Sequence, residues 1–323
     1  MRLSVCIPVY NVAPYVEKCA RSLFEQTYAD IEYIFVDDAT PDDSIEIVRR
    51  VLKDYPKRQP HVKFLRHETN RGLVAARKTA IRAATGGLIT HCDSDDWLDV
   101  DLYAKMIARL EEMDADAVLC STQRYLGGRV VVCECPNRLS LSGMDAMLQM
   151  DALPGLNSLV TKIFRWRCVD LSSMEWPDGI SIAEDYCHTM QVLPRCRLLT
   201  SVSGAYYHYR VNANSMTRSG NVRRLVDQHI RVYDILTRRV PNACGVPARR
   251  NLVRAILFWG TVSGLLSRRA FERWRCTFNK LGGRWDWSDM SLWGQRMMRL
   301  AEKSFLLSQL LVPIARQKVQ DYL

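Results

Sequence analysis

The chain has 323 residues, of which 48% are hydrophobic and 25% are charged, and its formal net charge at pH 7 is +10. This composition is that of an ordinary globular protein with a buried core, and the length allows two domains or one large domain with an appendage. The charge is uneven, since residues 221–323 hold 19 Lys and Arg against 7 Asp and Glu. A basic tail favours an anionic partner, either membrane or nucleic acid, although a solvated helical face is the simpler alternative.

The cysteines and the apolar segments argue against secretion and membrane insertion. The eleven cysteines are odd in number, scattered and without a C-x-x-C pair, which indicates reduced, buried thiols in a cytoplasmic protein and not a zinc site. Residues 1–5 enter strand-like sequence at once without a signal-peptide pattern, so we expect no export. The most apolar later run, residues 255–266, is well short of the roughly twenty residues that span a bilayer.

Strand-like and helix-like segments alternate through the first 120 residues. Strands are predicted over residues 2–9, 31–37, 62–66, 88–92 and 116–120. Helices are predicted between them over about residues 13–26, 42–54, 72–85 and 99–112, the third ending at a Gly86-Gly87 C-cap. Strict alternation predicts an α/β fold, with a mainly parallel sheet covered by helices on both faces.

The pattern changes in the second half of the chain. Residues 121–220 are less regular and contain one acidic helical stretch, residues 181–193. Beyond about residue 220 the sequence becomes helical and basic, without repeats. We therefore predict a boundary near residue 220 and a helical C-terminal extension over residues 221–323.

Aspartates gather where the predicted parallel strands end. The segments 8–11, 36–40 and 92–96 follow three of these strands, and ligands of parallel sheets bind beyond the carboxyl ends of the strands. Asp93, Asp95 and Asp96 would repel one another unless water screened them or a cation bound there. Mn²⁺ or Mg²⁺ bound together with a diphosphate is the simplest ligand that would relieve this repulsion, since these ions prefer carboxylate and phosphate oxygens. Neither a G-x-G-x-x-G after the first strand nor a P-loop is present, so metal and cationic side chains must meet the phosphate charge.

A further acid, Asp185, suits general base catalysis. Attack by a hydroxyl group needs its proton removed as the new bond forms, and one positioned carboxylate suffices when a metal-bound diphosphate is the leaving group. The alternative is that Glu184 and Asp185 are ordinary acids in a first helical turn, favoured there by the helix dipole.

Five segments together resemble the family-2 glycosyltransferases of the GT-A fold. They are SVCIPVYNVAPYVEKCARSLFEQTYADIEYIFVDDATPDDS, NRGLVAARKTAI, ATGGLITHCDSDDW, EDY and YYHYRVNANSMTR, the last resembling a segment of bacterial members that build surface polysaccharides. The resemblance covers about residues 1–220 and implies a Rossmann-like GT-A domain, with a nucleotide-sugar half over 1–100 and an acceptor half over 101–220. Residues 221–323 lie outside it.

The resemblance implies roles for residues at matching positions. Pro8 and Tyr10 would lie near the nucleotide base, and Asp37 or Asp38 would hydrogen-bond a uracil edge. The resemblance also implies the remaining roles: Arg77 beside the base or phosphates, Asp93 at the ribose and near the metal, Ser94 at the nucleotide, Asp95 as metal ligand with Asp96 in support, and Asp185 as base.

Other candidates for the sugar or acceptor side are Trp97, Glu184, His208 and Arg210. His208 and Arg210 could approach the diphosphate, but aromatic-rich strands are more often core. Asn157 and Lys162 could face the acceptor, whereas His91 reads as a satisfied buried histidine.

The leading hypothesis is an inverting, metal-dependent transferase that moves a sugar from a UDP-sugar to a hydroxyl of a glycan or lipid-linked acceptor. A sugar-1-phosphate nucleotidyltransferase would need a Gly-rich basic N-terminal loop that is absent. A nucleic-acid-binding protein would use tail tryptophans on a basic groove; we expect no nucleic acid. An amphipathic helix over residues 292–311 predicts peripheral binding to the anionic inner face of the cytoplasmic membrane, with packing on the catalytic domain or a homodimer seam as alternatives.

Overall fold

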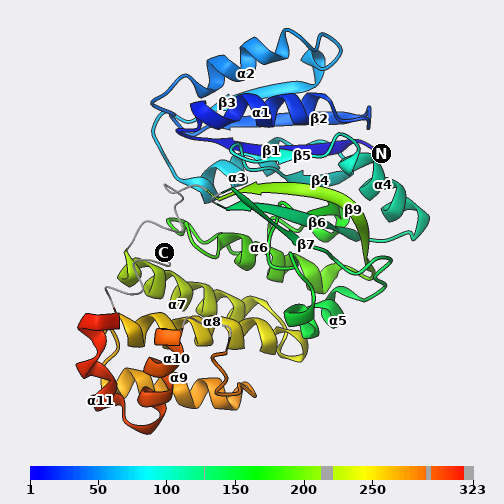
Figure 1. Cartoon of the computed structure of the whole chain (residues 1–323). Helices are drawn as coiled ribbons and strands as arrows, with labels where there is room; N and C mark the ends of the chain where they lie inside the picture. Colours follow the sequence, from blue (N-terminus) through cyan, green and yellow to red (C-terminus); the bar gives the residue numbers. More distant parts are fainter. Residues whose placement is uncertain (127, 212–220, 289–291, 316–323) are drawn as a thin grey trace. The chain divides into compact units, whose positions relative to one another are not determined.

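The computed structural model of the chain describes residues 1–126, 128–211, 221–288 and 292–315. These residues divide into two compact units: residues 1–180 and 184–212 form unit 1, while residues 181–183 and 213–323 form unit 2. Figure 1 shows the strands in unit 1 and the long helices of the C-terminal part in unit 2. Within the described residues, no helix is both long enough and apolar enough to cross a membrane.

Unit 1 is built around a mixed sheet. The strands are β1 (Leu3–Val9), β2 (Ile31–Asp37), β3 (Val62–Arg66), β4 (Leu88–His91), β5 (Trp97–Leu98), β6 (Ala117–Leu126), β7 (Arg129–Cys133), β8 (Lys162–Arg165) and β9 (Leu199–Arg210). In the described part of the chain they follow the order β3-β2-β1-β4-β8-β6-β9-β5, with β7 paired to β6. The four strands from β3 to β4 are parallel, as the alternating sequence pattern predicts.

The expected α/β sheet is present, but it is mixed, because antiparallel pairs appear beyond β4. Strand β8 lies between β4 and β6 and is antiparallel to both. The alternating pattern ends at residue 120, and with it the strand–helix–strand repeat that makes successive strands parallel, so β8 is free to enter antiparallel. The expected segment 116–120 is the start of the longer β6, which pairs in parallel with β9.

The helices of unit 1 lie close to their predicted positions, except for α5, which was not predicted. They are α1 (Ala13–Phe24), α2 (Ser44–Leu52), α3 (Leu73–Ala83), α4 (Leu102–Glu112), α5 (Gly143–Leu148) and α6 (Glu184–Val192), with short 3₁₀ turns at Gln59–His61, Met150–Ala152, Trp166–Cys168 and Leu193–Arg195. The expected glycine C-cap of α3 is wrong, because Ala84 caps it in an extended conformation. Gly86 has another use: a Cβ there would lie 2.6 Å from the carbonyl oxygen of Arg2.

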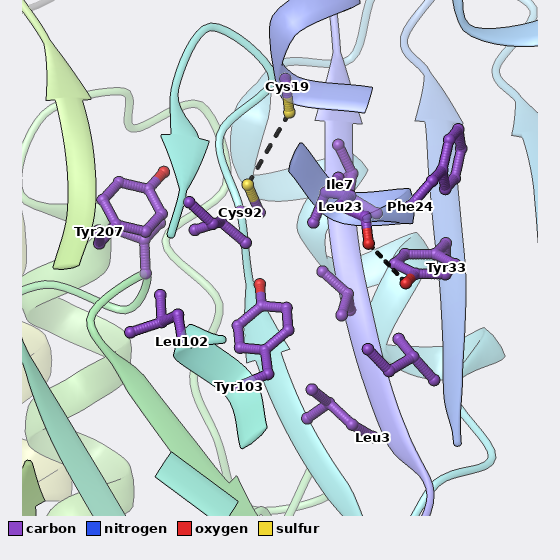
Figure 2. Packing of buried hydrophobic residues seen from close by; sticks show 14 of the residues in the cluster. Leu3, Ile7, Cys19, Leu23, Phe24, Tyr33, Cys92, Leu102, Tyr103 and Tyr207 are labelled. Atoms are coloured by element: carbon purple, nitrogen blue, oxygen red, sulfur yellow. Dashed lines mark hydrogen bonds between the residues drawn. The ribbon is translucent and has the colours of Figure 1, made fainter. Parts of the chain in front are cut away.

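Strand alternation decides which residues of β1 face which helices. Leu3, Val5, Ile7 and Val9 belong to one buried cluster with residues of α1, α2 and α4, whereas α3 lies against β1 and β2 without contributing to that cluster. Helices thus cover both faces of the sheet. Figure 2 shows part of the cluster, in which the Tyr33 hydroxyl donates to the carbonyl of Leu23 at 2.7 Å. The eleven cysteines are all free thiols, and most of them are buried.

Unit 2 is helical in its described residues. Its helices are α7 (Val222–Arg239), α8 (Asn242–Val262), α9 (Arg268–Lys280), α10 (Leu292–Lys303) and α11 (Phe305–Leu310). Aromatic residues fill its core: Phe271, Trp274, Phe278 and Trp287 are all less than 10% exposed.

The single helix expected over residues 292–311 is wrong. It is interrupted at Ser304, whose hydroxyl accepts from the N–H of Leu307 and caps α11. Met297 and Met298 of α10 are fully buried in the core of unit 2, so this part of the apolar stripe is structural. Leu306, Leu307 and Leu310 of α11 remain 52–72% exposed.

Candidate active site

The carboxyl ends of β1, β2 and β4 meet at one edge of the sheet. Val9 is aligned with Asp37 at the ends of β1 and β2, and Cys6 is aligned with His91 across β1 and β4. The residues that follow these strands are therefore neighbours, as the sequence pattern predicts. Tyr10, directly after β1, is 46% exposed, whereas Pro8 is buried within β1.

The two aspartates that end β2 are both engaged with protein groups. Asp37 Oδ1 accepts from the N–H of Thr40 at 2.8 Å, and its Oδ2 lies 3.4 Å from Arg66 Nε. Asp38 is buried; it contacts His67 Nδ1 at 2.6 Å and accepts from the backbone N–H groups of residues 71 and 72. Asp38 thus holds the loop that leads into α3.

The segment after β4 places its carboxylates in different surroundings. Asp93 is 28% exposed at its side chain, and Asp95 is partly exposed. Ser94 and Asp96 are buried. Asp96 accepts from the Tyr207 hydroxyl and from the Arg210 N–H, both at 2.7 Å. Burial, with Asp95 and Asp93 nearby, raises the pKa of Asp96 well above its usual range. The two hydrogen bonds of Asp96 connect the segment after β4 to β9.

Arg77 of α3 connects this segment with α6. Its buried guanidinium lies 2.8 Å from Asp93 Oδ1 and 3.1 Å from Glu184 Oε1, and it also contacts Asp185 Oδ1. One cation therefore faces three carboxylates from two segments that are far apart in the sequence. The sequence signal was present, because Arg77 stood in a family motif, but its partners could not be read from the chain.

The adjacent carboxyl groups of Glu184 and Asp185, both in contact with Arg77, differ in acidity. Burial, reinforced by Asp185, raises the pKa of Glu184 to about 7. Burial also opposes ionisation of Asp185, but the charge of Arg77 outweighs it and lowers the pKa of that carboxyl. Environments that separate the pKa values of adjacent carboxyl groups are a mark of functional sites. Asp185 is therefore the more acidic member of the pair.

Asp185 is held from both sides. It lies in the first turn of α6, after Ala183, whose φ is 62°. Oδ1 faces Arg77, while Oδ2 accepts from Ser158 Oγ at 3.2 Å and from the N–H of Leu159 at 3.4 Å. The helix-terminus alternative is right about position, yet a simple cap would not need these contacts from two separate segments, α3 and the loop that holds Ser158 and Leu159.

Buried histidines surround the same cluster. His91 of β4 and His188 of α6 are both buried, and burial, with Arg77 nearby, lowers the pKa of each to about 3. They are therefore neutral at physiological pH. His91 is buried as expected, but the expectation that it is fully satisfied is wrong: among the described groups, its Nδ1 finds no hydrogen-bond partner.

Trp97, His208 and Arg210 form a second group beside Asp95. The rings of Trp97 and His208 stack with centroids 5.2 Å apart, and His208 Nε2 lies 2.7 Å from Asp99 Oδ1. The Arg210 guanidinium lies over the Trp97 ring at 4.9 Å, and its Nε donates to the carbonyl of Asp95 at 3.2 Å. Lys18 of α1, which sequence reasoning missed, lies 3.3 Å from the centre of the Trp97 ring.

The acceptor-side expectation for Lys162 is wrong. Its side chain is fully buried and donates to the backbone oxygen of Gly155 at 2.8 Å. Asn157 is exposed. A lysine inside an apolar strand pattern gave no sign in the sequence that its ammonium would be directed inward.

The donor chemistry at this edge fits a hard divalent cation in part. Asp93 and Asp95 offer carboxylate oxygens with some exposure, the type of ligand that Mn²⁺ and Mg²⁺ prefer. In the described residues no three His, Cys, Asp or Glu side chains gather closely enough to form a complete metal site. Such ions are often held by one or two carboxylates, with substrate phosphates completing the shell.

Part of the chain is similar to known glycosyltransferases. Residues 4–132 match the family described as Glycosyl transferase family 2. The uncharacterised glycosyltransferase EpsJ of Bacillus subtilis is 29% identical over 222 residues, which are 67% of this chain and 62% of EpsJ. Poly(ribitol-phosphate) β-N-acetylglucosaminyltransferase TarS of Staphylococcus aureus is 24% identical over 212 residues, 65% of this chain and 35% of TarS. The matches thus span less than two thirds of the length of these relatives.

Two solved structures share the fold. Residues 1–349 of S. aureus TarS, in complex with UDP-GlcNAc, align with a TM-score of 0.68 and 17% identity over 99% of this chain and 93% of that one. The mannosyltransferase PcManGT of Pyrobaculum calidifontis, in complex with GDP-Man and Mn²⁺, aligns with a TM-score of 0.57 and 17% identity over 99% and 86%. At these identities the likeness concerns the fold.

Proposed function

Because residues 4–132 form a family-2 glycosyltransferase domain and the fold is of the GT-A type, we propose that the chain transfers a sugar from a nucleotide-sugar to a hydroxyl group. The donor proposed is a UDP-sugar, and the acceptor is a glycan or a lipid-linked sugar. One observation carries this proposal: Arg77 links Asp93, beside the proposed donor site, to Asp185, the proposed base. The solved structure of TarS, which shares the fold, is a complex with the nucleotide-sugar UDP-GlcNAc, and this supports the proposed donor class.

On the donor side, we propose that Pro8, Tyr10 and Asp37 lie around the nucleotide base. Asp38 is better suited to hold the loop before α3, since both of its oxygens already accept hydrogen bonds. Ser94 and Asp93 would adjoin the nucleotide. Trp97, His208 and Arg210 would border the sugar and diphosphate, where the guanidinium beside the Asp95 carbonyl supplies positive charge.

Asp95, with Asp93, would hold Mn²⁺ or Mg²⁺. When bound, the ion would neutralise negative charge that grows on the departing diphosphate. The carboxylates and Arg77 are the chain's own contribution at this position: Arg77 offsets part of the charge of Asp93 and keeps that side chain in place. The Mn²⁺ complex of PcManGT supports a divalent ion for the fold.

On the acceptor side, Asp185 would remove the proton from the attacking hydroxyl. The acceptor oxygen forms a bond to the anomeric carbon while the bond from that carbon to the phosphate oxygen breaks, and the leaving diphosphate takes the electron pair. Arg77 favours the ionised state of Asp185, so the base is ready at neutral pH. A single displacement inverts the anomeric centre.

The acceptor would be reached at a membrane surface. Leu306, Leu307 and Leu310 of α11 are exposed, and α10 carries the exposed cations Arg296, Arg299 and Lys303. Exposed leucines with nearby cations suit peripheral binding to anionic lipid, at the inner face of the cytoplasmic membrane where lipid-linked acceptors are extended. The nucleic-acid alternative has less support, because Trp274 and Trp287 are buried in the core of unit 2.

A donor screen tests the proposed function. Purified protein would be incubated with UDP-, GDP- and other nucleotide-sugars plus Mn²⁺ or Mg²⁺, and release of free nucleotide would be measured without an acceptor. We expect slow, metal-dependent release from one donor, stopped by EDTA. No release and no binding of any nucleotide-sugar would overturn the proposal.

A further inference from the structure

Lys162, at the start of β8, is a buried cation outside the proposed chemistry. Its side chain is 0% exposed. Nζ donates to the carbonyl of Gly155 at 2.8 Å, to Thr161 Oγ1 at 3.0 Å and to the carbonyl of Ser158. Within the described residues its ammonium forms no salt bridge with a carboxylate. Burying a charged amine costs folding free energy. A buried lysine without a carboxylate partner is therefore a candidate for a functional role.

All three acceptors of Lys162 belong to one short loop, residues 155–161. Thr161 Oγ1 also donates to the carbonyl of Gly155 at 2.8 Å, and Gly155 has a φ of 78°, which favours glycine. The loop is thus wrapped around the ammonium. Since loop carbonyls that point inward need a donor, Lys162 supplies the hydrogen bonds that a helix or strand would otherwise provide.

The outer side of the same loop contacts the proposed base. The carbonyl oxygen of Ser158 accepts a hydrogen bond from Lys162 Nζ, and the hydroxyl of Ser158 donates to Asp185 Oδ2 at 3.2 Å. The adjacent N–H of Leu159 lies 3.4 Å from the same oxygen. A chain of contacts therefore runs from the ammonium through the loop to the carboxylate.

We propose that Lys162 is a positioning residue: it folds the 155–161 loop so that Ser158 and Leu159 fix the orientation of Asp185. The inference rests on the proposed function, in which Asp185 is the base. Burial lowers the pKa of Lys162 to about 7, with Cys120 and Asp185 opposing that shift, which agrees with an amine that serves as a hydrogen-bond donor in a low-dielectric site.

The groups that face Asp185 set the expected effect on acidity. They are Arg77 of α3, Asp93 and His91 from the β4 segment, Glu184 and His188 of α6, and Lys162 itself. Hydrogen bonds to an ionised carboxylate lower its pKa. Loss of the loop hydrogen bonds and loss of the nearby positive charge should each raise the pKa of Asp185. The acid limb of the pH profile of kcat should therefore move to higher pH.

The test compares Lys162→Met, Ser158→Ala, Asp185→Asn and a control, Thr200→Val, in the full chain. Thr200 Oγ1 is buried without a hydrogen-bond partner among the described residues, so this control makes a buried polar side chain apolar outside the loop. We expect Lys162→Met to lower kcat by about 10- to 100-fold, the range for a misplaced catalytic group, with an unchanged donor KM. Ser158→Ala should move kcat and the acid limb in the same direction to a smaller extent, and Thr200→Val should leave both unchanged.

The outcomes separate this inference from the proposed function. If Asp185→Asn loses turnover while Lys162→Met and Ser158→Ala keep the wild-type kcat and acid limb, the positioning role is refuted and the base assignment stands. If Asp185→Asn keeps turnover, the base assignment itself fails. Should Lys162→Met not fold, Ser158→Ala decides the matter, because an unchanged acid limb in that folded variant overturns the inference.

Discussion

The guanidinium of Arg77 donates through Nη1 to Asp185 Oδ1 and so joins α3 to the first turn of α6. Through Nη2 the same group holds Asp93 at 2.8 Å. The two ends of the proposed reaction, leaving group and attacking hydroxyl, are therefore served by carboxylates that share one cation. Any change at Arg77 should affect both.

Arg77→Met should cost about 3–5 kcal/mol of unfolding free energy, because it leaves buried carboxylates without their cation. Urea unfolding followed by circular dichroism measures this. The matched control is Arg2→Met, which removes an exposed ion pair with Asp30 and should cost no more than about 1 kcal/mol. An equal loss of unfolding free energy in the two variants would mean that the buried ion pairs of Arg77 stabilise the fold no more than an exposed ion pair does.

Glu184→Gln should stabilise the protein at alkaline pH. The folded pKa of Glu184 is raised to about 7, above its ordinary value of 4.5, so its contribution to stability is present below pH 4.5 and is lost as pH rises through 7. The glutamine keeps an oxygen for Arg77 and avoids ionisation. We expect a gain of about 1–3 kcal/mol at pH 8 and little difference at pH 4.

Unfolding free energies at pH 4, 6 and 8 check the prediction for Glu184. A variant that is less stable than wild type at pH 8 would contradict it. The result would then mean that Glu184 is ionised and favourably paired in the folded state.

Asp185→Asn should keep nucleotide affinity but lower turnover by roughly 10²- to 10⁴-fold, the range for a lost general base. The amide preserves size and cannot take a proton. The matched control is Asp145→Asn, another acid in a first helical turn, which is exposed on α5 and should leave turnover unchanged. Near-normal turnover in Asp185→Asn would point to a capping role and redirect the search to Glu184.

UDP should bind weakly without a divalent ion, because Asp93 and Asp95 add negative charge where the diphosphate must lie. Calorimetry with Mn²⁺, with Mg²⁺ and with EDTA measures this, and we expect a loss of roughly tenfold or more in EDTA. Asp95→Asn should weaken the metal dependence, while Asp101→Asn, an exposed acid paired with Lys105, should preserve it. Identical affinity in EDTA would remove the ion from nucleotide binding.

Substituting Leu306, Leu307 and Leu310 with glutamine should reduce co-sedimentation with anionic vesicles, since these exposed leucines would enter the lipid interface. These point changes are preferable to a truncation near residue 288, because Met297 and Met298 are part of the core of unit 2. The control changes Val130, Val131 and Val132 of β7, which are also exposed, to threonine. A full-length protein that ignores anionic vesicles at low salt would end the membrane proposal.

The first half of the fold could be predicted because its signals are local. β1, β2 and β3 have apolar runs bounded by turn residues, and their observed limits lie within a residue of those expected. β8 could not be placed, because a four-residue strand outside the alternating strand–helix pattern leaves its direction to tertiary packing. The break at Ser304 was also missed, although a serine before an apolar run is a capping signal.

The site was predictable as a set of residue types at one sheet edge and not as a network. Asp93, Asp95 and Asp185 were chosen from their chemistry and from a family resemblance. That Arg77 would be buried among carboxylates, and that Lys162 would be directed inward, depends on contacts between segments far apart in sequence. Residue type does not determine such contacts.

The position of β8 has a consequence for synthesis of the chain. β4 and β6 both precede β8 in the chain but are joined through this strand, which begins at Lys162, and Asp185 lies 108 residues after Arg77. While the ribosome has delivered only the first half, the β4 edge has no strand to pair with and Arg77 can meet only Asp93. Unpaired strand edges invite association, so the nascent chain depends on timely arrival of residues 162–185 to cover the β4 edge and to assemble the acidic cluster.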